Sequence, residues 1–258
     1  MNKITEKWVV LPDMQIKSDR NGNITGVDMK TLIPVLFCLT QNRWDGLVIL
    51  GDFLDFNCIS SHNNGFPRLI EGQSLAKDYK IGNKILDQVV NAVRKNNKKC
   101  RIVFLEGNHE YRVERLIDAN PTLEGIIEVP EGLHFKARNI EWIPCYKDNT
   151  DFNYKKLTFT HGVYTNDLHA KSHVTKFGHS VVYGHLHDFQ AYTFPRRGKS
   201  DNIIGVSMMC LCTSQEWEKT PNRWQQGFGV VYFWGDGYFQ IQPILINKHR
   251  FVFNNKEY

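Results

Sequence analysis

The sequence contains no hydrophobic run long enough to cross a membrane. No stretch of its 258 residues approaches the roughly 18 consecutive apolar residues that a transmembrane helix needs. Residues 1–7 lead directly into a short apolar segment and show no apolar core of a secretory signal peptide. The sequence therefore predicts a cytoplasmic protein with no membrane partner.

Paired cysteines of the Cys-x-x-Cys type are also missing. The six cysteines are scattered at positions 38, 58, 100, 145, 210 and 212. This spacing indicates neither a zinc knuckle nor a thioredoxin-type motif. We expect reduced thiols that are mostly buried, because free cysteine behaves as a small hydrophobic residue.

Internal repeats, low-complexity tracts and linkers are absent as well. We therefore expect a single domain over 1–258, with its core motifs in 13–187, strands of a second sheet in 188–246, and a polar tail at 247–258 that frays. The net charge of +5 is compatible with an anionic substrate, but it is too small to establish nucleic-acid binding.

The first half of the chain alternates between strands and helices. Apolar segments at 8–12, 47–50 and 101–106 predict buried strands. Helical patterns separate them at 29–42, where Asp28 is the expected cap, and at 75–97, which Ser74 precedes. This order predicts parallel strands joined by right-handed crossovers.

The second half contains many more strands than helices. The expected helix covers 165–177, and the expected strands are 140–143, 157–160, 180–183, 188–194, 203–207, 229–234 and 238–245. The last two are joined by a glycine-rich hairpin turn. The sequence therefore predicts an α/β fold, a four-layer α-β-β-α sandwich of two mixed sheets flanked by helices.

Five polar clusters follow apolar segments of the chain. They are Asp13-x-Gln15, Gly51-Asp52-x-x-Asp55, Gly107-Asn108-His109-Glu110, Thr160-His161-Gly162 and Gly184-His185-Leu186-His187. Ligands bind where the carboxyl ends of strands share one edge of an α/β sheet, so these clusters are expected to converge. Such mixed oxygen and nitrogen donors suit two divalent ions such as manganese, iron, zinc or nickel, and such a pair can clamp a phosphoryl group.

This ordered set of clusters resembles the calcineurin-like metallophosphoesterases. The segments 107–112 and 221–228 further resemble the members carried by phages and prophages. The resemblance implies that Asp52 bridges two metal ions. It also implies that Asp13, Gln15 and His187 complete one metal site, whereas Asn108, His161 and His185 complete the other. Gln15 stands where the family usually has His. Either the first metal is bound more weakly, with manganese or magnesium preferred, or Gln15 holds a water molecule; we expect the weaker binding.

The resemblance also implies the chemistry. A hydroxide bridging the two metals would attack phosphorus, Asn108 would help to stabilise the developing charge, and His109 would protonate the leaving group. Asp55 would orient His109. Arg112 is a candidate for binding the substrate phosphate, and a solvated helix face is the equally weighted alternative.

We expect a phosphodiester substrate in DNA, RNA or a nucleotide. The alternatives are a phosphomonoesterase acting on a nucleotide or phosphoprotein, and a non-catalytic interaction module on the same fold, which the Gln15 replacement keeps open. A protein Ser/Thr phosphatase fits less well, since Asp55 is followed by Phe56-Asn57 where that branch has Arg-Gly.

Several other features receive structural interpretations. His169 and His173 are four residues apart and predict a polar helix face. The basic segment 195–199 predicts a solvated hairpin tip rather than a contact with a phosphate backbone. Trp217, Trp224 and Phe228 fall in a predicted loop that either stacks bases or packs over the second sheet.

Overall fold

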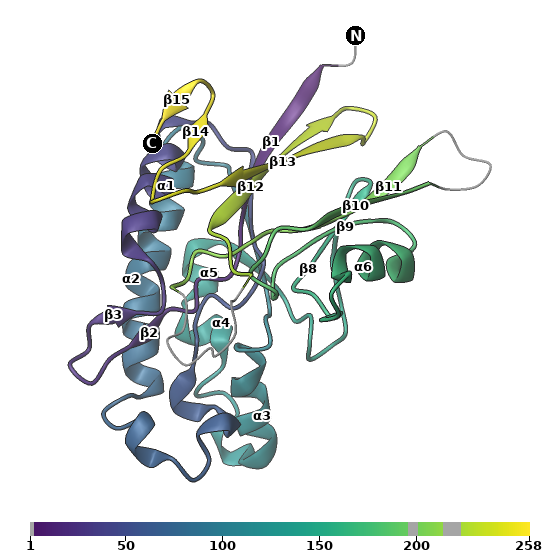
Figure 1. Cartoon of the computed structure of the whole chain (residues 1–258). Helices are drawn as coiled ribbons and strands as arrows, with labels where there is room; N and C mark the ends of the chain where they lie inside the picture. Colours follow the sequence, from purple (N-terminus) through teal and green to yellow (C-terminus); the bar gives the residue numbers. More distant parts are fainter. Residues whose placement is uncertain (1–2, 196–200, 214–222) are drawn as a thin grey trace.

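Two mixed β-sheets lie between helices in the computed structural model, which describes residues 3–195, 201–213 and 223–258 (Figure 1). The six-stranded sheet has the order β13-β12-β1-β4-β5-β6. Its members are β1 (Ile4–Leu11), β4 (Gly46–Ile49), β5 (Arg101–Leu105), β6 (Ile140–Ile143), β12 (Gly227–Trp234) and β13 (Phe239–Leu245). The five-stranded sheet has the order β10-β11-β9-β8-β7. It contains β7 (Phe152–Tyr154), β8 (Leu157–Thr160), β9 (Ser180–Tyr183), β10 (Ala191–Pro195) and β11 (Asn202–Ser207).

Side chains cap the two long helices of the first half of the chain. The helices are α1 (Met29–Gln41), α2 (Leu75–Arg94), α3 (Tyr111–Ala119), α4 (Val129–Gly132), α5 (Phe135–Arg138) and α6 (His169–Phe177). As predicted, Asp28 caps α1, because its side chain accepts a hydrogen bond from the Lys30 amide. Ser74 caps α2 in the same way. Two short strands, β2 (Lys17–Ser18) and β3 (Ile24–Thr25), form a separate hairpin.

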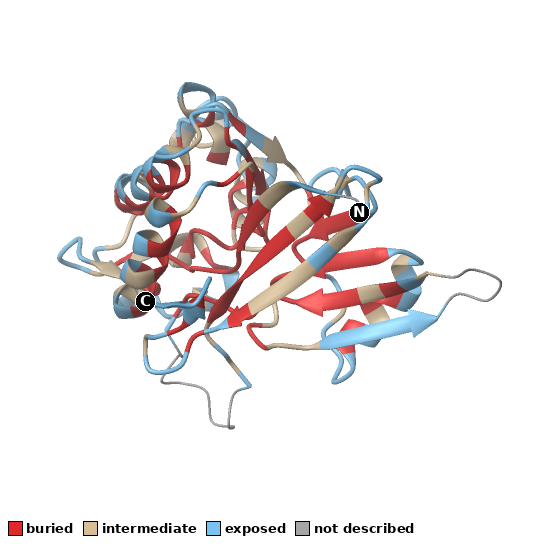
Figure 2. Ribbon diagram, turned by 90° about the horizontal axis from the view of Figure 1, so that it is seen from above, coloured by how far each residue is buried: buried red, intermediate tan, exposed pale blue. Residues whose placement is uncertain are grey.

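Alternation along the central strands creates the predicted layers. On β1, Val9 and Leu11 join the buried cluster shared with α1 and α2, whereas Trp8 and Val10 join the cluster shared with the second sheet. Helix α6 packs against β9, β10 and β11. A cluster of buried side chains lies between the two sheets. Strand β10, at the edge of the second sheet, is exposed along its length (Figure 2). The α-β-β-α architecture is confirmed.

The assignment of the last strands to the second sheet was wrong. Strand β12 pairs antiparallel with β1, with Val230 opposite Val9, and β13 continues the same sheet. Strand β6 also joins the first sheet, parallel to β5. A hydrophobic alternation predicts a strand but does not identify its partner, which here lies more than 200 residues away along the chain.

The prediction that the tail frays was also wrong. Residues Val252–Phe253 (β14) and Lys256–Glu257 (β15) form a hairpin. Phe253 is buried and stacks on Trp44, with 5.9 Å between the ring centroids. Two aromatic anchors, Phe251 and Phe253, thus hold a segment whose composition is mainly polar.

Three further expectations concern burial and exposure. Five of the six cysteines are buried, Cys58 is half-buried and all are free, as predicted. No helix within the described residues combines the length and hydropathy that a membrane span requires.

Two of the loop predictions cannot be compared with the structure, because residues 196–199 of the predicted hairpin tip and Trp217 lie outside the described residues. Phe228 belongs to β12 and is buried in the core of the first sheet, not in a loop.

Candidate functional site

The five polar clusters meet at one edge of the sandwich. Asp13 lies two residues beyond β1, and Asp52 lies beyond β4. Asn108 follows β5 by three residues, His161 directly follows β8, and His185 follows β9. All these strands deliver their carboxyl ends to the same region, so side chains from both halves of the chain come together.

One group of potential ligands consists of Asp52, His161 and His185. Their ligand atoms all lie within 4.8 Å of one another, and the side chains are buried or nearly so. The Nδ1 atom of His161 is 2.8 Å from the Leu50 carbonyl oxygen, which leaves Nε2 facing Asp52 at 3.4 Å. The Oδ1 atom of Asn108 lies 3.0 Å from the same Nε2. The predicted ligands of the second metal thus converge.

The predicted ligands of the first metal lie together as well. Nε2 of His187 is 3.4 Å from Oδ1 of Asp13. The side-chain nitrogen of Gln15 is 3.5 Å from the same Nε2 atom, so coordination by Gln15 requires its amide oxygen to occupy that position instead. Asp13 also accepts the backbone N–H of His185, which links the two groups.

The backbone of these clusters is strained. Gln15, Asp52, His185 and His187 all have positive φ, at 47°, 47°, 74° and 62°. Non-glycine residues adopt this conformation uncommonly, and such positions concentrate at functional sites. At Gly184 a Cβ atom would collide with the Asp13 carboxylate, so the close approach of the two loops requires glycine there.

The electrostatics of the cluster fit a bound cation. Burial disfavours the charged form of His161, but the charge of Asp52 outweighs it and raises the pKa of His161 to about 10. Likewise, the ion pair with Asp13 outweighs burial and raises the pKa of His187 to about 9. Burial and the charge of His161 lower the pKa of His185 to about 4. Its buried Nδ1 has no hydrogen-bond partner among the described residues, as expected of a neutral imidazole that is free to ligate.

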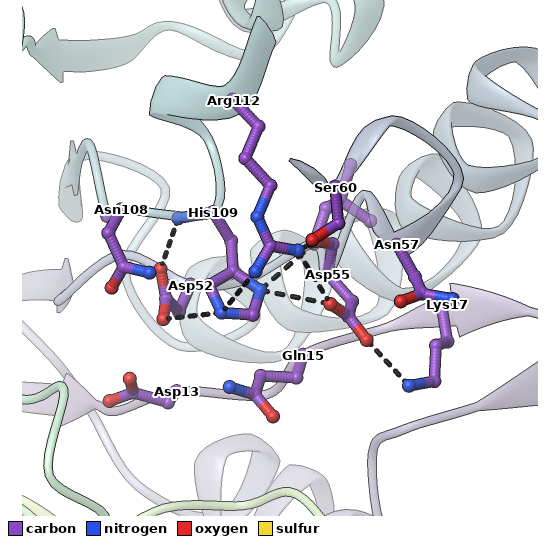
Figure 3. A network of polar contacts seen from close by, with 12 residues as sticks. Asp13, Gln15, Lys17, Asp52, Asp55, Asn57, Ser60, Asn108, His109 and Arg112 are labelled. Atoms are coloured by element: carbon purple, nitrogen blue, oxygen red, sulfur yellow. Dashed lines mark hydrogen bonds and ion pairs between the residues drawn. The ribbon is translucent and has the colours of Figure 1, made fainter. Parts of the chain in front are cut away.

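His109 lies between two carboxylates beside this cluster (Figure 3). Its Nδ1 atom is 3.0 Å from Oδ1 of Asp55, and its Nε2 atom is 3.6 Å from Oδ2 of Asp52. Burial alone would lower the pKa of His109, but the charges of Asp52 and Asp55 raise it. Asp55 therefore lies where its carboxylate can fix the orientation of the His109 ring.

Arg112 contacts the same network instead of pointing to solvent. Its Nη1 atom donates to Oδ1 and to the backbone oxygen of Asp55, at 3.1 and 2.6 Å. Its Nη2 atom lies 3.2 Å from Nε2 of His109. Lys17, which sequence reasoning missed, forms an ion pair with Asp55 at 2.6 Å. No local pattern around Lys17 in the sequence indicates this contact.

Glu110 links the loop that follows β5 to the loop that follows β4. Its buried carboxylate accepts the backbone N–H groups of Asp52, Leu54 and Gly107, at 2.7, 3.0 and 3.0 Å. Burial and the charge of Asp52 raise the pKa of Glu110 to about 7. The sequence places Glu110 in the same cluster as Asn108, but nothing in the spacing reveals that it binds backbone.

Replacing Glu110 by Ala is therefore expected to destabilise the fold. Three buried N–H groups lose their acceptor, so the free energy of unfolding should fall by about 3 kcal/mol or more. Urea unfolding monitored by circular dichroism measures this change. The matched control is Glu114→Ala on α3, the helix that Glu110 precedes; it removes an ion pair with Lys147 and should cost less than about 1 kcal/mol. Equal losses in the two variants would contradict the bracing role of Glu110.

Replacing Gln15 by His is expected to tighten metal binding. Imidazole is a stronger ligand for transition metals than an amide oxygen, and Gln15 already lies next to Asp13 and His187. We expect the weaker of two manganese affinities to rise on the order of tenfold, measured by isothermal titration calorimetry. Gln240→His, on the exposed face of β13, should change neither affinity. An unaltered affinity in Gln15→His would show that Gln15 is not a ligand.

A groove runs along α3 beside the cluster. It has a volume of about 630 Å³, and its lining includes Asn108, His62, Tyr111, Arg112, Arg115 and Tyr146. Asn108 thus connects the groove to the candidate metal ligands. The groove presents cationic and aromatic side chains, which can contact the phosphates and bases of a nucleotide chain.

The interpretation of His169 and His173 as a polar helix face was wrong. Both are buried. His169 places Nδ1 2.7 Å from the Tyr183 hydroxyl and Nε2 3.0 Å from Oδ1 of Asp188, whereas His173 stacks on the Tyr183 ring. Spacing along a helix shows which residues share a face but not which face is covered. Through this ion pair, His169 holds Asp188, the residue that directly follows His187.

No family model and no curated protein sequence matches this chain. Among solved structures, the chain is similar to Vps29 of Chaetomium thermophilum, with a TM-score of 0.39 and 10% sequence identity. The match covers 95% of this chain and 100% of that chain. A similarity of this size supports no conclusion about activity.

Proposed function

We propose that this protein is a binuclear metal-dependent phosphoesterase that prefers phosphodiesters. The observation that carries the proposal is the convergence of carboxylate, amide and imidazole groups from distant parts of the chain, with Asp52, His161 and His185 within 4.8 Å of one another. Two buried carboxylates, Asp13 and Asp52, would be costly without compensating positive charge. Bound divalent ions would provide that charge.

The residues divide between two metal ions, with manganese expected first and iron, zinc, nickel or magnesium also compatible with the donors. Asp52 would contribute to both ions. Asp13, His187 and the Gln15 amide oxygen would hold one ion, and Asn108, His161 and His185 would hold the other. When bound, the ions would supply Lewis acidity, polarising a phosphoryl oxygen and lowering the pKa of a water molecule.

His109 and Arg112 would act together on the leaving group. A guanidinium only donates hydrogen bonds, so in the neutral ring Nε2 of His109 accepts at the 3.2 Å contact and Nδ1 carries the proton facing Asp55. Acid catalysis requires a proton on Nε2. If Arg112 turns its Nη2 group to a phosphate oxygen, Nε2 is released and can hold a proton for the leaving oxygen, while Asp55 keeps the ring oriented.

The groove along α3 favours a nucleotide or nucleic-acid phosphodiester. It offers Arg112 and Arg115 for phosphate and Tyr111 and Tyr146 for a base or sugar. A phosphomonoester would occupy only the end next to Asn108. The net charge of +5 also favours an anionic substrate.

Hydrolysis of two model substrates tests the proposal. We expect turnover of bis-p-nitrophenyl phosphate in the presence of manganese, and a higher kcat/KM for it than for p-nitrophenyl phosphate. A preference for the monoester would identify a phosphomonoesterase. No turnover of either substrate, with manganese bound, would contradict an enzymatic role and favour an interaction module.

Variants in the groove test the substrate class. Arg115→Ala should weaken binding of a short single-stranded oligonucleotide and lower the salt dependence of its affinity, because one phosphate contact is lost. Hydrolysis of p-nitrophenyl phosphate should stay unchanged. Lys84→Ala on α2 is the matched loss of a cation outside the groove.

A further inference from the structure

A pair of thiols lies behind His187, on the side of the ring opposite Asp13. Cys210 and Cys212 are buried, and their sulfur atoms and a nitrogen of His187 lie within 4.8 Å of one another. Nδ1 of His187 is 3.8 Å from Sγ of Cys212, whereas Nε2 faces Asp13. One imidazole therefore has two edges with different surroundings, one with oxygen donors and the other with sulfur donors.

The distances between these atoms suit tetrahedral coordination. Zinc–sulfur bonds of about 2.3 Å and zinc–nitrogen bonds of about 2.0–2.1 Å place the two ligand atoms roughly 3.6 Å apart. The observed 3.8 Å between Nδ1 and Sγ is close to that value. Two sulfurs and one nitrogen form a soft donor set, which selects zinc or copper(I) over manganese or magnesium.

The backbone holds both cysteines in place. The N–H of Cys210 donates to the Gln225 carbonyl oxygen at 3.0 Å, and the Cys210 carbonyl oxygen accepts the N–H of Gly227 at the same distance. The side chain of Gln226 donates to the Cys212 carbonyl oxygen at 3.4 Å. A site whose ligands are already positioned loses little ordering entropy when the metal binds.

A cavity gives access to this group of residues. It has a volume of about 390 Å³, and Cys210, Cys212, Trp224, Gln225 and Gln226 contribute to its lining. The Trp224 ring packs edge-on against the His187 ring, with 4.2 Å between centroids. The cavity provides an entry path for an ion and space for a water molecule as the fourth ligand.

We propose that Cys210, Cys212 and Nδ1 of His187 form a thiolate–imidazole site for one soft cation, with zinc as the expected ion. On binding, each thiol releases its proton to solvent, and both sulfurs coordinate as thiolates. This site adjoins the proposed phosphoesterase centre, because both draw on His187, but it does not depend on the activity of that centre. A neutral imidazole coordinates through one nitrogen only, so an ion held by Nδ1 leaves the ring proton on Nε2, facing Asp13. An ion on the sulfur side and an ion on the oxygen side therefore compete for His187.

Cobalt(II) absorption spectroscopy tests the proposal in protein kept reduced. Cobalt is added to the Asp52→Asn variant, in which the proposed phosphoesterase centre binds metal more weakly. The thiol site can therefore be observed separately. We expect a sulfur-to-cobalt charge-transfer band that saturates at one equivalent of cobalt. The band should disappear when Cys210→Ser and Cys212→Ser are added. It should persist with Cys58→Ser, a half-buried cysteine at another place in the chain.

Two results would overturn the proposal. One is the absence of a thiolate band in both the wild-type protein and Asp52→Asn, and the other is a band that survives loss of both cysteines. A measurement that needs no cysteine substitution covers the case in which the double variant does not fold. X-ray absorption of zinc-loaded Asp52→Asn should show sulfur neighbours at about 2.3 Å, and a first shell of nitrogen and oxygen alone would exclude the site.

Discussion

Replacing Asp52 by Asn is expected to abolish metal-dependent hydrolysis. Asp52 lies against His161 on one side and His109 on the other, so its charge serves both the metal ligands and the acid. Loss of a metal ion removes several kcal/mol of transition-state stabilisation, which corresponds to about a thousandfold or more in rate. Manganese affinity, measured by titration calorimetry, should fall together with turnover.

The fold of this variant should remain intact. In the wild-type protein the backbone N–H of His109 donates to Oδ1 of Asp52 at 2.9 Å. The amide oxygen of Asn can accept the same hydrogen bond. Circular dichroism and urea unfolding check this point. Asp87→Asn, an exposed carboxylate on α2 paired with Arg138, is the matched control and should leave metal binding and turnover unchanged. Unaltered manganese affinity in Asp52→Asn would remove the basis for the proposed centre.

Replacing His109 by Ala is expected to lower kcat by about 10² to 10⁴ while metal affinity stays the same, as for the loss of a general acid. The nitrogen atoms of His109 face Asp55 and Arg112. The loss should depend on the leaving group. An ester with an alkyl leaving group needs the proton and should suffer the full loss, whereas p-nitrophenolate departs without it and should suffer much less.

This dependence on the leaving group separates acid catalysis from general damage to the site. Steady-state rates for a series of phosphodiesters with leaving groups of increasing basicity should give a steeper decline in His109→Ala than in the wild-type protein. Asp55→Asn should show a smaller loss with the same trend, since it perturbs the orientation of the ring and leaves the acid in place. Parallel declines for His109→Ala and the wild-type protein would rule out His109 as the proton donor.

Local patterns in the sequence were sufficient to predict the layers and the convergence of the polar clusters at one edge. Apolar residues alternate along β1, and Asp28 begins α1, so the elements depend on neighbours in the chain. Asp13, Asp52 and His185 follow strands whose ends share an edge. For this reason their convergence could be predicted without knowledge of the packing.

Partners that lie far apart in the sequence could not be predicted in this way. The pairing of β12 with β1 and the docking of Phe253 on Trp44 depend on contacts between the two ends of the chain. The same holds for His173, which lies on a helix face that is polar in sequence and covered by Tyr183 in the structure. Burial depends on the assembled layers and not on the residue type alone.

The sequence by itself determined which chemical groups reach the end of each strand, because strand and turn signals are local. Only the tertiary structure decided how those groups are used: Glu110 binds three backbone N–H groups, Arg112 contacts His109, and Cys212 faces His187. Hydrogen bonds and ligand geometry depend on distances of a few tenths of an ångström between segments that packing alone brings together.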